Sequence, residues 1–228
     1  MEPHASAALS IVIPTLDAAD CLTATLGAIA GGGAEVIVAD GGSTDATRAI
    51  AEGHGATVVV APRGRGAQLA AGAGRAGGRW LLFLHADTAP GAGWAETVAR
   101  FTADPANQDR AAVFRFALDD TGVWPHLLER GVAWRCRVLG LPYGDQGLLI
   151  GRGLYDAIGG YRPWALMEDV DLVRRIGRRR LHVLDVAAVT SAQRYRDGGY
   201  VRRPLLNLCC LVLYFLGMPP AVLARLYR

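Results

Sequence analysis

A chain of 228 residues, 51% of them hydrophobic, is expected to form one domain with elaborations around a well-packed core. The formal net charge of +3 is too small to indicate a nucleic-acid partner. All 24 basic residues are arginine, and the lack of lysine excludes a phosphate-binding-loop lysine, a Schiff-base lysine and a lysine general base.

Short apolar runs alternate with helical patterns in the first half of the chain. Strands are expected at residues 9–13, 35–39, 56–60 and 80–84. The first strand should stop at Pro14, a helix should span 20–30, and Ser43 or Thr44 should cap a helix that runs to about Glu52. Strands separated by helices of this length indicate right-handed βαβ units, which predicts a mostly parallel α/β sheet with helices on both faces.

Acidic residues follow two of these strands directly. The run 80–84 ends in His85-Ala86-Asp87, and the run 36–39 ends in Asp40. In open α/β sheets, ligands bind outside the carboxyl ends of the strands. We therefore expect both acids at one edge of the sheet, where a carboxylate and an imidazole two residues apart suit a metal or phosphate site.

The second half of the chain is less regular. We expect a strand at 111–118, a helix at 124–139 and a short strand at 147–150.

A further helical pattern begins at Glu168. Asp169 shares one face with the apolar Leu172, Val173 and Ile176, so Asp169 should head the stripe that faces the core. Glu168 and Asp171 fall on a different face, which we expect to be solvated, with Asp171 paired to Arg174 or Arg175.

The C-terminal segment is strongly apolar. No charged residue occurs from Pro204 to Ala224, but a spanning helix needs roughly 20 apolar residues, so the run 205–216 is too short to cross a bilayer unaided. Flanking arginines suit either an interfacial helix beside anionic lipid or a helix buried against the domain or a second copy of the chain. We expect a main domain at 1–198 and an apolar helical extension at 199–228.

The cysteines and the N-terminus bear on the cellular compartment. Cys21, Cys136, Cys209 and Cys210 show neither zinc-site spacing nor a disulfide framework, so we expect buried free thiols. The N-terminus lacks the basic and apolar regions of a signal peptide. We therefore expect a cytoplasmic protein, either free or peripheral to the inner face of the membrane.

Four motifs, taken in order, resemble glycosyltransferase family 2. They are Ile-Pro-Thr-Leu-Asp at 13–17, Val-Ala-Asp-Gly-Gly-Ser-Thr-Asp at 38–45, His-Ala-Asp at 85–87 and Glu-Asp at 168–169. The resemblance covers nearly the whole chain. It implies an inverting, nucleotide-sugar-dependent enzyme of the GT-A fold, with a nucleotide-sugar half at about 1–90 and an acceptor half at about 91–198. Leu-His-Ala-Asp-Thr, Tyr-Gly-Asp-Gln and Met-Glu-Asp-Val-Asp are more narrowly similar to a small bacterial branch described as radical SAM- and selenodomain-associated transferases.

The resemblance implies a donor site in the first half. Pro14, Thr15 and Asp17 would border the nucleotide, and Asp40 would hydrogen-bond the base or the ribose, with the following glycines allowing close backbone approach. Alternatively, the glycines only form a tight turn and Asp40 caps the next helix.

The loop 63–68 offers backbone N–H groups, two guanidiniums and a helix start, which suit a diphosphate, so Arg65 and Gln68 are expected to contact the donor. Solvated turns have the same composition. His85 stands where the family commonly has an aspartate, and with Ala86 it would line the donor site. It could contact the ribose, bind metal as a neutral imidazole, or only satisfy the end of the strand.

Asp87 stands at the position of the family's usual metal contact. A divalent cation, Mn²⁺ or Mg²⁺, held by few protein groups and by diphosphate oxygens would stabilise charge on the leaving nucleoside diphosphate. The alternative is that Asp87 caps the segment that starts at Gly91. Arg194 belongs to Gln193-Arg194-Tyr195, which partly resembles the Gln-x-x-Arg-Trp element of processive members, and it could reach the diphosphate.

Asp169 is the expected general base, because inverting transfer needs one carboxylate to take the acceptor's proton. Glu168 would position the acceptor or cap the helix, although both acids could instead only complement the helix dipole. Asp145, Gln146 and Trp164 would line the acceptor side, and simple packing would suit Trp164 equally well.

The leading hypothesis is an inverting transferase that moves a sugar from a nucleoside diphosphate, by family habit uridine diphosphate, to an unknown acceptor. A nucleotidyltransferase would carry a glycine-rich signature directly after the first strand and usually a lysine, and both are missing. A non-catalytic module that binds nucleotide sugars or a membrane surface is the other alternative, suggested by His85 and the apolar C-terminal segment. Loss of turnover in Asp169→Asn with retained donor binding would separate enzyme from module.

Overall fold

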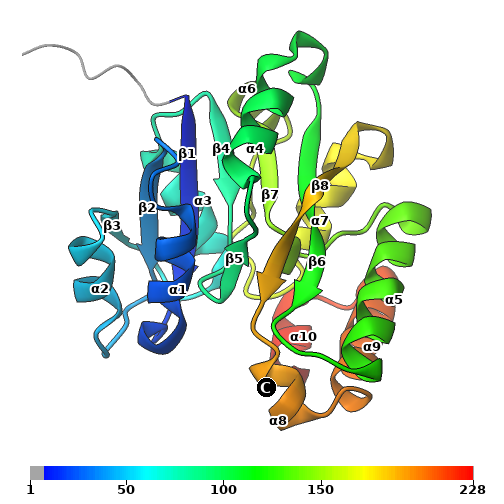
Figure 1. The fold of residues 1–228 in the computed structure, drawn as a ribbon. Coiled ribbons are helices and arrows are strands. Elements are labelled where there is room, and N and C mark those ends of the chain that lie inside the picture. The colour runs from blue at the N-terminus through cyan, green and yellow to red at the C-terminus, as the bar shows by residue number, and fades with distance from the viewer. Residues whose placement is uncertain (1–7, 228) are drawn as a thin grey trace, which may run out of the picture.

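A computed structural model describes residues 8–227. An eight-stranded sheet in the order β3-β2-β1-β4-β7-β6-β8-β5 runs through the molecule, with helices packed around it (Figure 1). The strands are Leu9–Thr15 (β1), Glu35–Asp40 (β2), Thr57–Val60 (β3), Trp80–Phe83 (β4), Thr88–Pro90 (β5), Ala111–Leu118 (β6), Leu148–Gly151 (β7) and Leu181–Thr190 (β8).

The helices follow the strands in near alternation. They are Ala19–Ile29 (α1), Thr47–Gly53 (α2), Arg65–Arg75 (α3), Trp94–Ala103 (α4), Val123–Leu139 (α5), Arg152–Ala157 (α6), Glu168–Ile176 (α7), Gln193–Gly198 (α8), Arg202–Phe215 (α9) and Pro220–Leu226 (α10). Short 3₁₀ turns cover Pro105–Asn107, Gly144–Gln146 and Arg178–Arg180.

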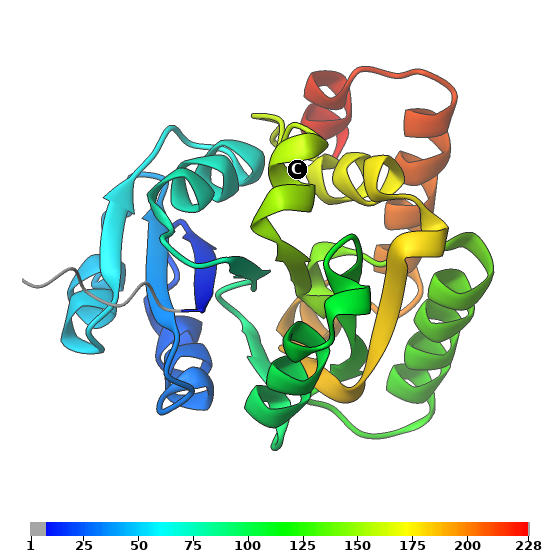
Figure 2. The ribbon, with the colours of Figure 1, turned by 90° about the horizontal axis from the view of Figure 1, so that it is seen from above.

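The first half is a parallel unit wound on both sides. β1 pairs in parallel with β2 and β4, and β2 pairs in parallel with β3. Figure 2 shows α1 and α2 on one face of these strands and α3 on the other. The prediction of a parallel sheet with helices on both faces is therefore confirmed for this half.

The second half is a mixture of parallel and antiparallel pairs. β7 lies antiparallel between β4 and β6, β8 runs parallel to β6, and β5 pairs antiparallel with β8. The expectation of a mostly parallel sheet is confirmed, because β6 and β8 run in the same direction as β1 to β4, and only β7 and β5 are reversed. The α/β class itself is confirmed.

Alternating side chains of the central strands fill two layers of core. Ile11 and Ile13 of β1 join the cluster under α1, and Val12 joins the cluster under α3. Leu82 and Phe83 of β4 divide in the same way. Because successive side chains of a strand point to opposite faces, continuous apolar runs are what a sheet covered on both sides requires.

Two local expectations were wrong. β1 continues through Pro14 to Thr15. Pro14 pairs with β2 only, because β4 has already ended at this point of the sheet. The missing N–H of Pro14 therefore costs no hydrogen bond to β4. Helix α2 begins at Thr47, whose N–H donates to the carboxylate of Asp45 at 2.9 Å, and neither Ser43 nor Thr44 caps it.

The C-terminal helices pack on α7, in the second half of the chain. Cys210 and Leu211 of α9 and Leu223 of α10 share a buried cluster with Val170 and Val173 of α7. Within residues 8–227 no helix is both long and apolar enough to cross a membrane. All four cysteines are free, as expected, but Cys209 is exposed and only Cys210 is buried.

Candidate functional site

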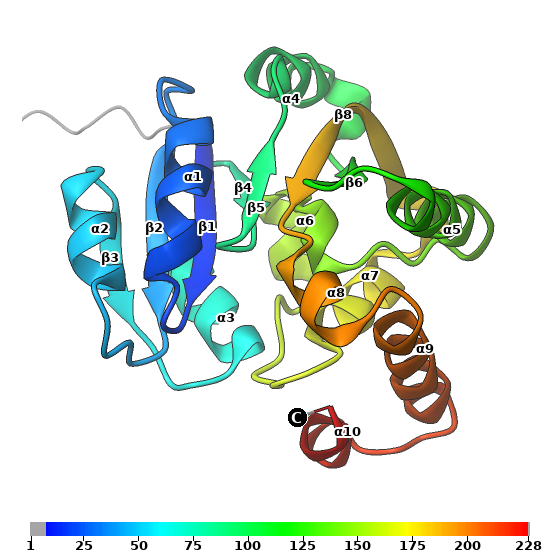
Figure 3. The same cartoon turned by 60° about the horizontal axis from the view of Figure 1, so that its bottom comes forward.

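Two cavities adjoin at the carboxyl ends of β1 and β4. The first, called here the β1 cavity, is open to solvent and is bordered by the end of β1, the loop before α3 and the turn after β4. The second, called the α7 cavity, is also open to solvent and lies between that turn, the start of α7 and the C-terminal helices. Figure 3 shows this end of the molecule with α8, α9 and α10 in front.

One wall separates the two cavities and belongs to both. Its residues come from α3, the turn after β4, the loop before α7, α8 and the end of the chain: Arg65, His85, Asp87, Leu166, Arg194 and Tyr227. A ligand that fills both cavities would therefore pass across these side chains.

Asp87 lies in the short turn between β4 and β5. The backbone N–H of Ser191 donates to its carbonyl oxygen at 3.0 Å, which fixes the turn to the end of β8. The side chain is 15% exposed, and its carboxylate has two neighbours at 3.5 Å, the guanidinium of Arg194 and the hydroxyl of Thr88. The oxygens of Asp87 are thus accessible from both cavities.

A metal ion at this wall would have few protein ligands. Within the described chain no cluster of three or more histidine, cysteine or acidic side chains could hold an ion. Asp87 alone offers a carboxylate, and His85 an imidazole, on the shared wall. Such a donor set fits Mg²⁺ or Mn²⁺ held by one or two protein groups with substrate phosphates and water, and it does not fit an all-protein cage.

His85 is neutral in this setting. Burial, with the nearby Arg65 and Arg194, holds the pKa of its imidazole well below the usual value. The ring packs against Gly144, where a Cβ would lie 2.5 Å from Nε2. Only glycine therefore allows this approach of the loop before β7.

Glu168 was expected on a solvated face, and this was wrong. Its side chain is fully buried and forms an ion pair with Arg65 at 3.2 Å. Burial raises the pKa of Glu168 to about 7, and the guanidinium of Arg65 only partly offsets this rise. The second carboxylate oxygen has no partner among residues 8–227. Asp171 is buried as well, and it pairs with Arg175 as expected, with a second ion pair to Arg162.

Asp169 lies half-buried at the start of α7 and faces the α7 cavity rather than the core. The backbone N–H of Gly144 donates to its Oδ2 at 2.8 Å, and the N–H of Val170 donates to its Oδ1 at 2.7 Å. Met167, the residue before the helix, has φ +64°, one of two positive φ values at non-glycine residues in the described part of the chain. This turn directs Glu168 inward and Asp169 toward the cavity, which the helical pattern alone did not reveal.

The end of β1 borders the β1 cavity with the predicted Pro14, Thr15 and Asp17. Asp17 is the other non-glycine residue with positive φ, at +48°. Its carboxylate accepts hydrogen bonds from the backbone N–H of Thr44 at 2.8 Å and from the hydroxyl of that residue. The loop after β1 is thereby tied to the loop after β2.

Asp40 does not line either cavity. It is fully buried, and its oxygens accept from the hydroxyls of Thr15 and Ser43 and from the N–H groups of Gly42 and Ser43. Arg48 adds an ion pair at 3.0 Å. Burial raises the pKa of Asp40, and these hydrogen bonds outweigh it and lower the pKa. These contacts tie Asp40 to the turn after β2. Asp40 does not cap the next helix, because α2 follows Ala46 and has no side-chain cap.

Gln68 and Arg65 of α3 both reach the β1 cavity, with Ala86 opposite. The amide of Gln68 donates to the carbonyls of Thr15 and Ala39 at 2.5 and 3.0 Å, so it links the ends of β1 and β2.

The three residues expected on the acceptor side differ in position. Asp145 lines the α7 cavity, and burial, with Asp169 and Asp87 nearby and opposed by Arg135, raises the pKa of its carboxyl to about 6. Gln146 is buried and donates to the carbonyl of Phe114. Trp164 packs against Tyr214 of α9. Gln146 and Trp164 line neither cavity.

Sequence reasoning missed the contribution of the C-terminal helices to the site. Arg203 and Asn207 of α9 and Tyr227 line the α7 cavity, together with Tyr143 and Tyr195. The hydroxyl of Tyr227 donates to Oδ1 of Asn207 at 2.8 Å. Asn207 is the one amide within the apolar run, and this was the available signal.

Comparisons with known proteins address the family and the fold. The family model described as glycosyl transferase family 2 matches residues 10–163. S. aureus TarS is similar in structure, with a TM-score of 0.64 and 16% sequence identity. The alignment covers 94% of this chain but only 41% of the TarS chain.

Glucosyl-3-phosphoglycerate synthase from Mycobacterium tuberculosis, in a complex with Mn²⁺, UDP-glucose and phosphoglyceric acid, has a TM-score of 0.60 at 18% identity. This alignment covers 92% of this chain and 80% of that chain. No curated protein matches the sequence. The structural neighbours agree in fold, and the family model covers more than half of the chain. The chain therefore belongs to glycosyl transferase family 2.

Proposed function

We propose that this glycosyltransferase transfers a sugar from a nucleoside diphosphate, uridine diphosphate in the first instance, to an acceptor with inversion at the anomeric carbon. The observation that carries the proposal is the position of Asp87 on the wall common to both cavities, with Asp169 facing the α7 cavity. A donor nucleotide in the β1 cavity would then present its sugar toward Asp169.

In this proposal the β1 cavity holds the nucleotide. Pro14, Thr15 and Asp17 border it at the end of β1, and Arg65, Gln68 and Ala86 face it from the other side. Arg65 and Arg194 are the cations nearest the place where a diphosphate would cross the shared wall. Guanidiniums suit such a position because they present several donors to phosphate oxygens.

Asp87, with the neutral imidazole of His85 beside it, would hold a divalent cation. The ion supplies positive charge that stabilises the leaving nucleoside diphosphate. Mn²⁺ in the complexes of the mycobacterial synthase supports a divalent ion here. The protein's own part is to hold the carboxylate accessible in a fixed turn and to add the charge of Arg194 at 3.5 Å.

Asp169 would act as the general base. Its two oxygens each accept one backbone N–H, so the side chain is oriented while free lone pairs remain toward the cavity. It would take the proton from the acceptor nucleophile as that group attacks the anomeric carbon on the side opposite the diphosphate. One base is sufficient for this step, and no protein nucleophile is required.

The acceptor would occupy the α7 cavity. Tyr143, Tyr195 and Tyr227 give it aromatic walls, while Asp145 and Arg203 give it charges of both signs. Such a lining suits a small polar molecule with an apolar portion. Glu168 contacts Arg65 and not the cavity, so in this proposal it positions the diphosphate-binding guanidinium.

Calorimetric titration of uridine and guanosine diphosphates, with and without Mn²⁺, tests the donor half of the proposal. We expect Mn²⁺-dependent binding of one nucleotide to the wild type and weaker binding to Asp87→Ala. The matched control is Asp109→Ala, since Asp109 is exposed and lines neither cavity. Absence of binding under every metal condition would remove the basis of the proposed donor site.

A further inference from the structure

Exposed apolar side chains gather on one group of helices. Sixteen large hydrophobic side chains are strongly exposed among residues 8–227, and fourteen of them belong to α5, to α10, or to α9 with its two capping residues. The two exceptions are Val60 and Val183. The rest of the described surface thus carries almost no such side chains.

Helix α5 carries an apolar stripe on its outer face. Trp124, Leu127, Trp134 and Val138 are spaced at i, i+3, i+10 and i+14, so they share one side of the helix. The two tryptophans are 55% and 60% exposed. The opposite side of the helix, with Val132, packs on β6 and α8. Core packing therefore does not account for the outer stripe.

Helix α9 repeats this arrangement. Leu205, Leu208, Val212 and Phe215 are exposed at i, i+3, i+7 and i+10, while the other side of the helix packs on α7. The C-terminal segment, expected either to be buried or to lie at an interface, thus has one buried side and one exposed side. Figures 1 and 3 show α9 and α5 on the same side of the molecule, away from β2 and β3.

The charges around the two stripes have one sign. Arg130 and Arg137 of α5, Arg202 of α9 and Arg225 of α10 are exposed, and these three helices expose no acidic side chain. Their single acid, Glu129, is half-buried and accepts a hydrogen bond from the backbone N–H of Leu118.

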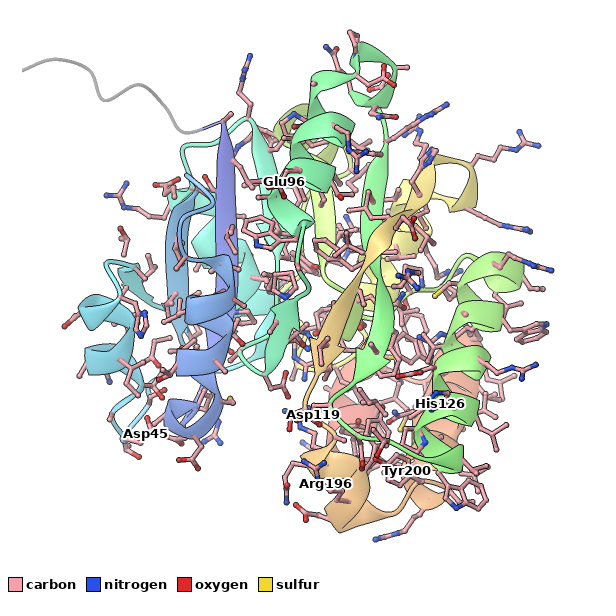
Figure 4. All side chains as sticks on the ribbon, in the orientation of Figure 1. Asp45, Glu96, Asp119, His126, Arg196 and Tyr200 are labelled. Atoms are coloured by element: carbon pink, nitrogen blue, oxygen red, sulfur yellow. The ribbon has the colours of Figure 1, made fainter. Side chains whose placement is uncertain are left out.

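The two acids that precede α5 in the chain are already paired. The guanidinium of Arg196 lies 3.7 Å from Asp119 and 3.5 Å from Asp120, and the hydroxyl of Tyr200 donates to Asp120. Figure 4 shows Asp119, Arg196 and Tyr200 grouped there, next to His126 on α5. The surface around the stripes therefore combines apolar side chains with net positive charge.

We propose that this surface, called here the docking face and made of the two stripes with their four exposed arginines, binds a membrane that contains anionic phospholipid. Tryptophan is favoured at the boundary between headgroups and acyl chains, where its ring is apolar and its N–H stays hydrated. Arginines beside an apolar stripe gain from the negative potential of anionic lipid. A second copy of the chain fits less well, because a two-fold contact would bring together two faces that both carry net positive charge.

The docking face also adjoins the candidate site. Arg203 and Asn207, which line the α7 cavity, belong to the same helix as the exposed leucines of α9. A helix with its side chains is about 10 Å across. Docking would therefore hold the α7 cavity within roughly one helix diameter of the lipid surface. The binding itself does not depend on the proposed transferase activity.

Vesicle flotation tests the proposal with the purified full chain, using phosphatidylcholine vesicles with and without phosphatidylglycerol. We expect the protein to float only with phosphatidylglycerol, and salt to weaken the binding. The double variants Trp124→Ser/Trp134→Ser and Arg130→Gln/Arg137→Gln should each lose affinity for these vesicles by about tenfold or more. The matched controls are Val60→Thr/Val183→Thr for exposed apolar residues and Arg79→Gln/Arg100→Gln for exposed arginines, and both should float like the wild type.

Circular dichroism establishes that each variant is folded, and Leu205→Gln/Leu208→Gln provides a second test of the apolar stripes should the tryptophan variant not fold. Binding that these variants leave unchanged, or no binding to anionic vesicles, would overturn the proposal. So would a stable dimer in analytical ultracentrifugation that Leu208→Gln dissociates, because the docking face would then be covered by a second copy.

Discussion

The guanidinium of Arg194 lies 3.5 Å from the carboxylate of Asp87, on the wall that both cavities share. The Arg194 side chain is 59% exposed, and exposed ion pairs contribute little to stability, at most about 1 kcal/mol. A role for Arg194 is therefore to be sought in ligand binding.

We expect Arg194→Ala to weaken binding of uridine diphosphate about tenfold, which corresponds to about 1.4 kcal/mol, because a cation beside the diphosphate is lost. Uridine, which carries no phosphate, should bind equally to variant and wild type, and the melting temperature should stay unchanged. Calorimetry with both ligands makes the comparison, with Arg100→Ala on α4 as control. Equal losses for uridine and its diphosphate would contradict this role.

The predicted base has a conservative test. Asp169→Asn keeps one oxygen that can accept the N–H of Gly144, loses the acceptor for the N–H of Val170, and removes the group that takes a proton. We expect turnover of the sugar nucleotide to fall by roughly 10²- to 10⁴-fold while nucleotide binding is retained. Release of the nucleoside diphosphate measures turnover, and calorimetry measures binding. If Asp169→Asn turns over like the wild type, another residue is the base.

The part of the fold that sequence predicts well is the part that local pattern determines. Buried strands such as Trp80–Phe83 are continuous apolar runs, and their polar ends carry the residues that line the cavities. The direction of each strand in the sheet is not determined by local pattern. β7 is antiparallel because the second half of the chain folds back on β4, and no residue of Leu148–Gly151 signals this.

The candidate site could be predicted only where each residue acts close to its own strand or helix end. Asp87 reaches the cavities from the turn in which it lies. Asp40 has the same local signal, yet Arg48 and Ser43 use its oxygens. Arg203 joins the site only through the packing of α9 on α7. The sequence around Arg203 does not indicate a contact of this kind between distant segments.

The start of α3 depends on a close approach of two backbones. The N–H of Gly66 donates to the carbonyl of Trp164 at 2.9 Å, and a Cβ on Gly66 would lie 2.1 Å from the carbonyl oxygen of Arg162. Backbone cannot move away as a side chain can, so Gly66→Ala should lower the free energy of unfolding by roughly 1–3 kcal/mol.

Gly74 in the same helix is the matched control, because a Cβ there meets nothing within 4 Å. Gly74→Ala should raise the free energy of unfolding by about 0.5–1 kcal/mol through helix propensity. Urea denaturation measures both variants. Similar values for the two would mean that the loop before α7 adjusts to the added methyl group, and that the contact does not constrain the site.

The buried pair of Glu168 and Arg65 predicts how stability depends on pH. Burial raises the pKa of Glu168 to about 7, and the unfolded chain has the ordinary value of about 4.3. Between these values the unfolded state binds fewer protons than the folded state, so the free energy of unfolding should fall as pH rises, by roughly 4 kcal/mol in total from this group. Glu168→Gln cannot titrate and keeps an oxygen for the guanidinium. From pH 4 to about pH 7 the wild type should therefore lose unfolding free energy relative to Glu168→Gln. Urea denaturation of both proteins at several pH values measures this difference. Parallel pH profiles would show that Arg65 holds Glu168 ionised throughout.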